Sequence, residues 1–234
     1  AMQGSCISNV DVGSATVKLS EDGTYNLLIG AADMGTGCDT ILAQMVAEMM
    51  DCSFEDVAVF GADTDASPYD SGSYASSTTY ITGKAVEKAC TELRSRICAI
   101  AAEMMNCEPE AVVMESGKVR KIDTNQTVSL TDIAYKAQVN NTIPAEATAT
   151  HSSPVSPPPY MVGMVEIELD KLTGLVTILD YMAVVDCGIP INPALARIQT
   201  EGGIVQGIGH TLMENVTYDS HGKPAERSFM QYKL

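Results

Sequence analysis

The sequence changes from a strand pattern to a helix pattern at residues 33–40, DMGTGCDT. Before this stretch, residues 14–30 alternate apolar and polar side chains around an Asp-Gly turn, which predicts a β-hairpin. After it, residues 39–50 carry apolar side chains at helical spacing. Glycine lets backbone N–H groups approach a ligand closely, and the N-terminus of a helix attracts anions. The stretch therefore predicts a ligand-binding loop between a hairpin and a helix.

A second glycine-rich stretch has similar surroundings. Residues 199–209, QTEGGIVQGIG, follow a second predicted hairpin at 161–185 and lie within a predicted helix at 193–213. Each glycine in a helix interior costs about 1 kcal/mol, which close packing against a neighbour or a ligand would offset. Two such stretches in one chain indicate that one large, polar, anionic cofactor is held from two sides.

The other predicted elements are a strand at 57–60, a long loop at 61–77 and a helix at 79–105. A loop of that length inside a compact domain usually carries function. Together the elements predict an α+β fold of two hairpin-plus-helix subdomains, with mixed or antiparallel sheets and glycine-rich cofactor loops. The first subdomain is expected at 1–125. The second, at 126–234, is expected to hold a proline-rich connector, a hairpin and a glycine-rich helix.

The composition indicates an acidic globular protein. The 234 residues are 45% hydrophobic and carry a net charge of −16. That charge disfavours nucleic acid and anionic membrane surfaces as partners, and no apolar run is long enough to span a bilayer. The seven cysteines show no C-x-x-C spacing, so neither a disulfide framework nor a zinc or iron–sulfur site is expected. Reduced thiols predict a cytoplasmic protein.

Three segments of the chain resemble the cofactor loops of one known family. Residues 33–44 resemble the acidic-Met-Gly-Gln-Gly loop of the molybdenum hydroxylases, in the molybdopterin-binding large subunits of xanthine dehydrogenases and aldehyde oxidases. Residues 63–77 are similar to the second cofactor loop of that family, and residues 186–209 to its third. Three motifs in the same order are more specific than one glycine motif. Within the family, the resemblance is closest to the C-terminal part of bacterial xanthine dehydrogenase molybdenum subunits.

The resemblance implies cofactor contacts in all three segments. The residues it assigns to cofactor binding are Met34, Gly35, Thr36, Gly37, Ala75, Ser76, Ser77, Thr78 and Gln199. The first loop would lie near the oxo ligand of the metal, residues 75–78 would hold the phosphate, and Gln199 would hydrogen-bond the pterin. Three positions depart from the family pattern. Thr36 replaces a glutamine, Ser77 replaces an arginine and Ile198 replaces a glycine.

The resemblance also implies an activity. It implies an oxidoreductase that hydroxylates an electron-poor carbon of a purine-like N-heterocycle or an aldehyde, using oxygen derived from water. The cofactor would be molybdopterin, with iron–sulfur clusters and FAD on other domains or subunits of an oligomer. The catalytic glutamate of the family is expected beyond Leu234, so this chain is expected to supply no catalytic residue and no metal ligand.

Two expectations concern the chain by itself. A further cofactor loop of the family is expected before residue 1, so the chain is expected to be cut at both ends, and to be inactive and free of cofactor on its own. The alternative is a non-catalytic, degenerate or split module of the same family that serves subunit packing. A free nucleotide-binding module is less favoured, because neither glycine stretch carries the lysine of a P-loop.

Overall fold

The computed structural model describes residues 1–140 and 144–233, so part of the predicted connector, residues 141–143, lies outside the described residues. The chain forms two compact units. The larger is Gly4–Pro158, and the smaller joins Ala1–Gln3 to Pro159–Leu234. The sequence-based division fell at 125/126 instead. The larger unit extends to Pro158 because a strand near its end pairs with its first strand.

A four-stranded mixed sheet forms the centre of the larger unit, in the order β3-β2-β1-β7. Strands β1 (Gly13–Leu19) and β2 (Tyr25–Ile29) make the predicted hairpin, and β7 (Glu146–His151) pairs antiparallel with the other edge of β1. Strand β3 (Val57–Gly61) pairs parallel with β2. A parallel pair needs a crossover, and helix α1 (Cys38–Met50) provides it. The predicted α+β class with mixed sheets is confirmed.

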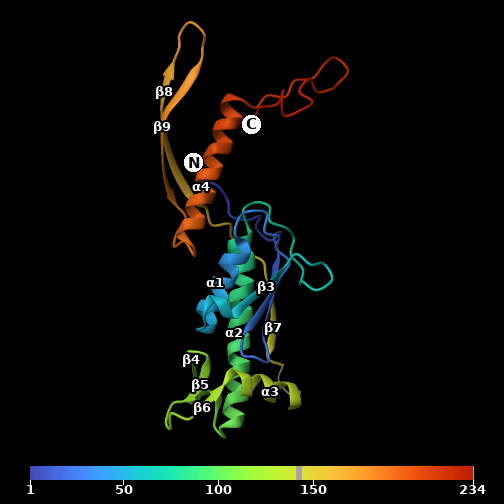
Figure 1. Ribbon diagram of the computed structural model, residues 1–234, viewed down its shortest axis with the longest axis vertical. Helices are drawn as coiled ribbons and strands as arrows, with labels where there is room; N and C mark the ends of the chain where they lie inside the picture. Colours follow the sequence, from blue (N-terminus) through green and yellow to red (C-terminus); the bar gives the residue numbers. More distant parts are fainter. Residues whose placement is uncertain (141–143, 234) are drawn as a thin grey trace. The chain divides into compact units, whose positions relative to one another are not determined.

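The core of the larger unit lies between this sheet and two helices. Helix α2 (Thr78–Met104) packs against β1 and β7, and α1 packs against β3 and α2 (Figure 1). One face of α2 consists of fully buried side chains: Val86, Ala89, Cys90, Leu93 and Ile97. Burying one Leu or Ile side chain contributes about 1.5–3 kcal/mol, so this one helix face supplies much of the stability of the unit.

A small sheet and a third helix lie at the C-terminal end of α2 (Figure 1). Their elements are β4 (Val112–Glu115), β5 (Lys118–Lys121), β6 (Thr127–Ser129) and α3 (Leu130–Asn140). Two short 3-10 turns, η1 (Phe54–Asp56) and η2 (Pro109–Ala111), precede β3 and β4. The small sheet and α3 thus lie at the end of α2 opposite to its start, which follows the long loop at 61–77.

The smaller unit contains the second predicted hairpin and the glycine-rich helix. Strands β8 (Tyr160–Leu169) and β9 (Val176–Asp186) pair antiparallel, and helix α4 (Pro193–Leu212) follows. The buried hydrophobic side chains of the described residues all lie between Cys6 and Ala147, so this unit has no apolar core of its own. Among the described helices, none combines the length and the apolar character that crossing a membrane requires.

Candidate functional site

Two of the predicted cofactor loops leave the central sheet at the same edge. Ile29 ends β2 and Gly61 ends β3, and these two residues are paired in register. Parallel strands have their carboxyl ends at one edge, where ligands of α/β units commonly bind. The first loop runs from there to α1, and the second runs from there to α2. The parallel pairing thus brings the two loops of the larger unit to one side of the sheet.

The second loop is fixed over the start of the first. A Cβ on Gly30 would lie 2.5 Å from the carbonyl oxygen of Pro68, so only glycine fits there. The hydroxyl of buried Thr82 donates to Asp70 Oδ2 at 2.8 Å. Further along, the backbone N–H of Ser71 donates to the carbonyl of Val12 at 2.9 Å. These contacts give the long loop a defined path across the sheet edge.

The carboxylate of Asp33 fixes the backbone of the first loop through hydrogen bonds. Asp33 accepts hydrogen bonds from the backbone N–H groups of Gly35 at 2.9 Å, Gly37 at 3.1 Å and Asp39 at 3.3 Å. Gly35 and Gly37 have positive φ angles of 102° and 77°, which glycine adopts without steric cost. Desolvation alone would raise the pKa of the Asp33 carboxyl, but these hydrogen bonds outweigh it and hold the pKa below its usual value.

Cys38 and Asp39 follow the first loop at the start of α1. Cys38 is 2% exposed and packs as a small buried residue. Burial raises the pKa of the Cys38 thiol to about 11, and the neighbouring carboxylates Asp33 and Asp39 act in the same direction. Burial, with the charge of Asp33, also raises the pKa of the Asp39 carboxyl. The thiolate is the nucleophilic form of cysteine, so the raised pKa disfavours a nucleophilic role for Cys38 at neutral pH.

The start of α2 has a different arrangement. Ala75 and Ser76 both have left-handed backbones, with φ of 52° and 58°, and Ser77 follows in right-handed helical geometry. Such a left-to-right step gathers successive N–H groups into a concave anion-binding shape. The side chain of its N-cap residue, Ser77, makes no capping hydrogen bond. The hydroxyl and the backbone N–H of buried Ser77 both donate to the carbonyl of Tyr74, at 3.0 Å and 3.3 Å. At the start of α1, the carboxylate of Asp33 binds the backbone.

The predicted site residues therefore fall into two groups. Met34 to Gly37 lie on the loop before α1, and Ala75 to Thr78 lie at the start of α2, both in the larger unit. Gln199 lies in the middle of α4, in the smaller unit. It does not sit at a helix N-terminus, because α4 begins at Pro193 with Asn192 as its cap. Its place relative to the two loops stays a prediction.

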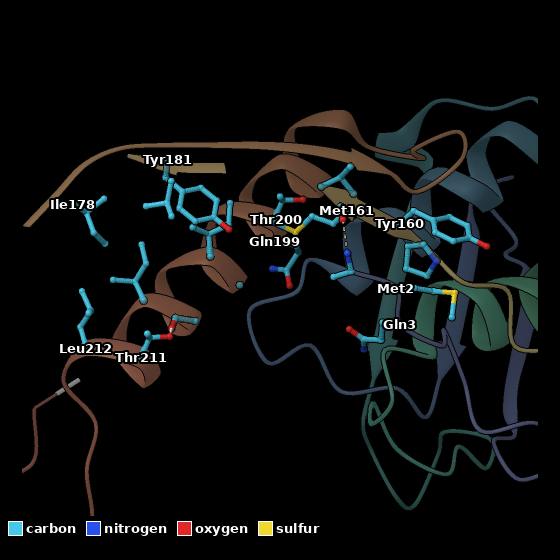
Figure 2. A pocket seen from close by; sticks show the side chains of 18 of the residues that line it. Met2, Gln3, Tyr160, Met161, Ile178, Tyr181, Gln199, Thr200, Thr211 and Leu212 are labelled. Carbon is cyan, nitrogen blue, oxygen red and sulfur yellow. Dashed lines mark hydrogen bonds between the residues drawn. The ribbon is translucent and has the colours of Figure 1, made fainter. Parts of the chain in front are cut away.

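Gln199 lines a groove within the smaller unit. The groove lies between α4 and the β8–β9 hairpin and encloses about 840 Å³ (Figure 2). Apolar side chains such as Val165, Ile178 and Ile204 form most of its wall. Thr211 also faces it, with its hydroxyl donating to the carbonyl of Gly207 at 2.7 Å. Gln199 is thus one of the few polar groups of an apolar groove.

One local pattern recurs in all three family segments. In each, an aspartate Oδ1 accepts the N–H of a glycine two residues later, and that glycine has a positive φ. The pairs are Asp33 with Gly35, Asp70 with Gly72, and Asp186 with Gly188. The sequence spacing Asp-x-Gly is a known turn pattern, so these aspartates could have been found from the sequence as loop anchors.

Comparison with known proteins identifies the family. A family model for the molybdopterin cofactor-binding domain matches residues 1–234. The chain is 36% identical over 234 residues to the probable hypoxanthine oxidase XdhD of Escherichia coli (strain K12), covering 99% of this chain and 24% of that protein. It is 34% identical over 224 residues to the 6-hydroxypseudooxynicotine dehydrogenase complex subunit gamma of Paenarthrobacter nicotinovorans, covering 93% of this chain and 28% of that protein.

A solved structure has the same fold. The crystal structure of quinoline 2-oxidoreductase from Pseudomonas putida 86 superposes with a TM-score of 0.87 at 27% identity, covering 100% of this chain and 32% of that chain. The chain thus spans 24–32% of the length of these three relatives. On the full-length match of the family model and these likenesses, the chain belongs to the molybdopterin cofactor-binding domains of the molybdenum hydroxylase family.

Proposed function

We propose that this chain is the molybdopterin-binding portion of an oxidoreductase that hydroxylates an electron-poor carbon of an N-heterocycle. The proposal rests on the names of three relatives of this chain. Hypoxanthine, 6-hydroxypseudooxynicotine and quinoline, after which the three relatives are named, all contain a nitrogen heteroaromatic ring. An N-heterocycle is therefore favoured over an aldehyde as the substrate.

The start of α2 fits the phosphate end of the cofactor. A phosphate needs several N–H or O–H donors and no competing negative charge. The left-handed step at Ala75 and Ser76 curves the backbone into a shape that suits an anion, and Thr78 carries a hydroxyl. Ser77 contributes less, since its hydroxyl and its backbone N–H both donate to the carbonyl of Tyr74, at 3.0 Å and 3.3 Å. The absence of an arginine at position 77 leaves backbone dipoles as the main source of attraction.

The first loop suits a different part of the cofactor. Its backbone donors at Gly35 and Gly37 already serve Asp33, and the Thr36 side chain hydrogen-bonds Cys38, so the loop offers a ligand side chains rather than backbone donors. Met34 is 69% exposed, and Thr36 is half-buried. We assign these two side chains to the neutral and metal-bearing end of the cofactor. When bound, the cofactor supplies the redox centre at which the substrate carbon is oxidised.

The assembly around this chain is part of the proposal. One relative is named as a subunit of a dehydrogenase complex, which supports an oligomer with iron–sulfur and flavin partners. The free cysteines of the chain support a cytoplasmic location. The second candidate function is a non-catalytic module of the same family. Thr36 and Ser77 favour it, because both stand where the family has a longer hydrogen-bonding side chain.

The test is the molybdenum content of the full-length protein that carries this chain, together with its oxidation of hypoxanthine, quinoline and benzaldehyde. We expect near-stoichiometric molybdenum and turnover of a heterocycle. Ser76→Asp places a carboxylate at the phosphate position and is expected to remove most of the molybdenum. Thr124→Asp, at an exposed turn, is the matched control and should leave the content unchanged. A wild-type protein that contains no molybdenum would favour the non-catalytic module.

A further inference from the structure

The first residues of the chain lie against the β8–β9 hairpin in the manner of a third strand. Ala1 and Met161 exchange both of their backbone hydrogen bonds: the Ala1 amine donates to the carbonyl of Met161 at 2.6 Å, and the N–H of Met161 donates to the carbonyl of Ala1 at 3.0 Å. Three successive residues keep one antiparallel register: Ala1 with Met161, Met2 with Tyr160, and Gln3 with Pro159. The direction and the register of a third strand are therefore set at one end of β8.

The same edge of β8 continues beyond Met161. In the described part of the chain, this sheet consists of β8 and β9 alone. Backbone N–H and C=O groups of successive residues in a strand point to opposite edges. Since Met161 directs its groups toward Ala1, the alternate residues Gly163, Val165 and Ile167 direct theirs to the same side. A row of backbone donors and acceptors thus runs along the free edge of β8, which can bind an extended segment.

Both faces of the sheet are apolar beside this edge. On one face, Val165 and Ile167 line the groove against α4. On the other face, Val162 and Met164 are 66% and 59% exposed. A hairpin of two strands is marginal in water, and a third strand with apolar side chains is the usual way to stabilise it. The edge therefore fits an apolar β-strand.

The residues joined directly to Ala1 in a longer protein are the best placed to supply this strand. The chain spans 24–32% of the length of its three relatives, so most of each relative lies outside the matched region. Residues joined to Ala1 would only have to extend an existing ladder, and no loop has to be closed. A second copy of the chain would lose the entropy of association instead, and it would meet Ala1 at the end of the edge.

We propose that, in the full-length protein, the residues immediately before Ala1 form a β-strand that runs antiparallel along β8 from Val162 to Leu169. Each step back from Ala1 is one step forward from Met161, so the first residue before Ala1 pairs with Val162. The register continues without interruption, because the bulge of the hairpin places its extra residue, Leu179, in β9 and leaves β8 regular. This inference does not depend on cofactor binding.

The register predicts a sequence pattern before Ala1. The second, fourth and sixth residues before it face the groove and should be apolar, and none of them should be proline, because their N–H groups donate to β8. The first and third lie beside Val162 and Met164 and should be apolar too. The fifth and seventh lie opposite Glu166 and Glu168, where basic or neutral polar side chains fit best.

A pair of cysteines in the full-length protein tests the register. A cysteine at the third residue before Ala1 is combined with Met164→Cys, because the two positions form a non-hydrogen-bonded pair with Cα atoms about 4.5 Å apart, within disulfide range. The matched control combines the same cysteine with Met182→Cys. Met182 pairs with Met164 on β9, so it lies one strand farther, at about 10 Å. After mild oxidation, peptide mass spectrometry should find the disulfide in most of the first protein and in none of the control.

Hydrogen exchange of the wild-type full-length protein is the second measurement, and it needs no variant. The amides of Val162 and Met164 point to β9 and serve as the reference within the same strand. We expect the amides of Gly163 and Val165 to exchange as slowly as this reference. The 234-residue chain lacks the proposed strand, so its hairpin is expected to open readily.

The outcomes are distinct. Fast exchange at Gly163 and Val165 beside slow exchange at Val162 and Met164 would show a free edge and overturn the proposal. Slow exchange without the disulfide to position 164, or with a disulfide to both positions, would mean that another segment or another register covers the edge, and would also overturn it. A full-length protein without residues before Ala1 has the same consequence. If the cysteine variants fail to fold, exchange in the wild type decides.

Discussion

Alanine is expected to have opposite effects on local stability at Gly35 and at Gly202. At either position an added Cβ would have no other atom within 4 Å, so space does not decide the effect of alanine. Gly35 has a φ of 102°, where an L-residue is strained by about 1–2 kcal/mol. Gly202 lies inside α4, where alanine is favoured over glycine by about 1 kcal/mol.

We therefore expect Gly35→Ala to loosen the first loop and Gly202→Ala to stabilise α4. Hydrogen exchange of the amides around each position measures the two effects locally. Gly35→Ala should speed exchange at residues 37–41, and Gly202→Ala should slow it at residues 203–209. Slower exchange in both variants would mean that Asp33 does not impose the left-handed backbone at Gly35.

Buried thiols make the stability of the chain depend on alkaline pH. Burial raises the pKa of Cys90 from its ordinary value of 9.0 to about 12, with a smaller contribution from Cys52. Because the folded pKa lies above the unfolded one, the stabilisation is complete below pH 9 and is lost as the pH rises toward 12. In that pH range, one such thiol lowers the free energy of unfolding by at most about 1.4 kcal/mol per pH unit.

The measurement is urea unfolding between about pH 8 and pH 11 for wild type, Cys90→Ala and Cys187→Ser, a range that brackets the onset of thiol ionisation. Cys90→Ala should be less stable at the low end of this range, because it leaves a small cavity, and should lose less stability as the pH rises. Cys187 is exposed, so Cys187→Ser should follow the wild-type curve. Parallel curves for wild type and Cys90→Ala would show that Cys90 does not remain neutral in the folded chain.

At the scale of the elements, Gly30 lies against rigid backbone, whereas Gly83 lies against a flexible side chain. A Cβ on Gly30 would lie 2.5 Å from a backbone carbonyl of the second loop, which cannot move without shifting that loop. A Cβ on Gly83 would lie 3.1 Å from the sulfur of Met45 on α1, and a methionine side chain can adjust. Overpacking in a fixed contact costs about 1–3 kcal/mol.

Gly30→Ala is accordingly expected to lower the free energy of unfolding by about 2 kcal/mol and to displace the second loop. Gly83→Ala is expected to cost less than about 1 kcal/mol, since it also gains helix propensity. Urea unfolding gives both values, and amide shifts at residues 68–72 report the loop. Equal losses in the free energy of unfolding for the two variants would mean that the second loop shifts as easily as the Met45 side chain.

Periodic elements could be predicted from the sequence, and non-periodic pairings could not. The hairpins β1–β2 and β8–β9 and helices α1, α2 and α4 begin and end within about two residues of their predicted limits, because each has a clear apolar period. No sequence pattern predicts β6 or β7. Strand β7, EATATH, offers only small apolar side chains, and its partner β1 is far away in the sequence. The parallel pairing of β2 and β3 also has no local pattern.

The candidate site follows the same rule. Glycine spacing indicated the first loop and length indicated the second, and both leave the central sheet at one edge. The roles of Asp33 and Asp70 were not predicted, although their Asp-x-Gly spacing could have indicated them. Ser77 was assigned to cofactor binding with its neighbours at 75–78, and its buried hydroxyl is used by Tyr74. Assignment of the other residues to the cofactor stays a prediction.

On the scale of the whole molecule, the two units should differ in local stability. The larger unit contains the buried apolar side chains, while the β8–β9 hairpin exposes Val162, Met164 and Leu179 among others. A two-stranded hairpin without a core is marginal in water. We expect its amides to exchange with solvent through local opening, at a free energy far below that of α2.

Hydrogen exchange followed by mass spectrometry tests this contrast. Peptides from residues 160–186 should exchange within seconds to minutes, and peptides from residues 86–97 should remain protected for hours. The β4–β5 hairpin, whose residues Met114 and Val119 are buried, serves as the internal control for a short hairpin that has a core. Equal protection of the two hairpins would show that β8–β9 is stabilised by contacts outside its own unit.

The pairing of β1 with β7 has a consequence for the synthesis of this chain. The hydroxyls of Thr16 and Thr148 lie 2.7 Å apart across these strands, yet 132 residues separate them in the sequence. A ribosome releases β1, β2 and α1 long before it has translated β7, so one edge of β1 stays open throughout that interval. An open strand edge is a template for a wrong partner. Translation pauses ahead of residue 146 are therefore the moments at which neighbouring nascent chains on one messenger are most prone to pair with each other.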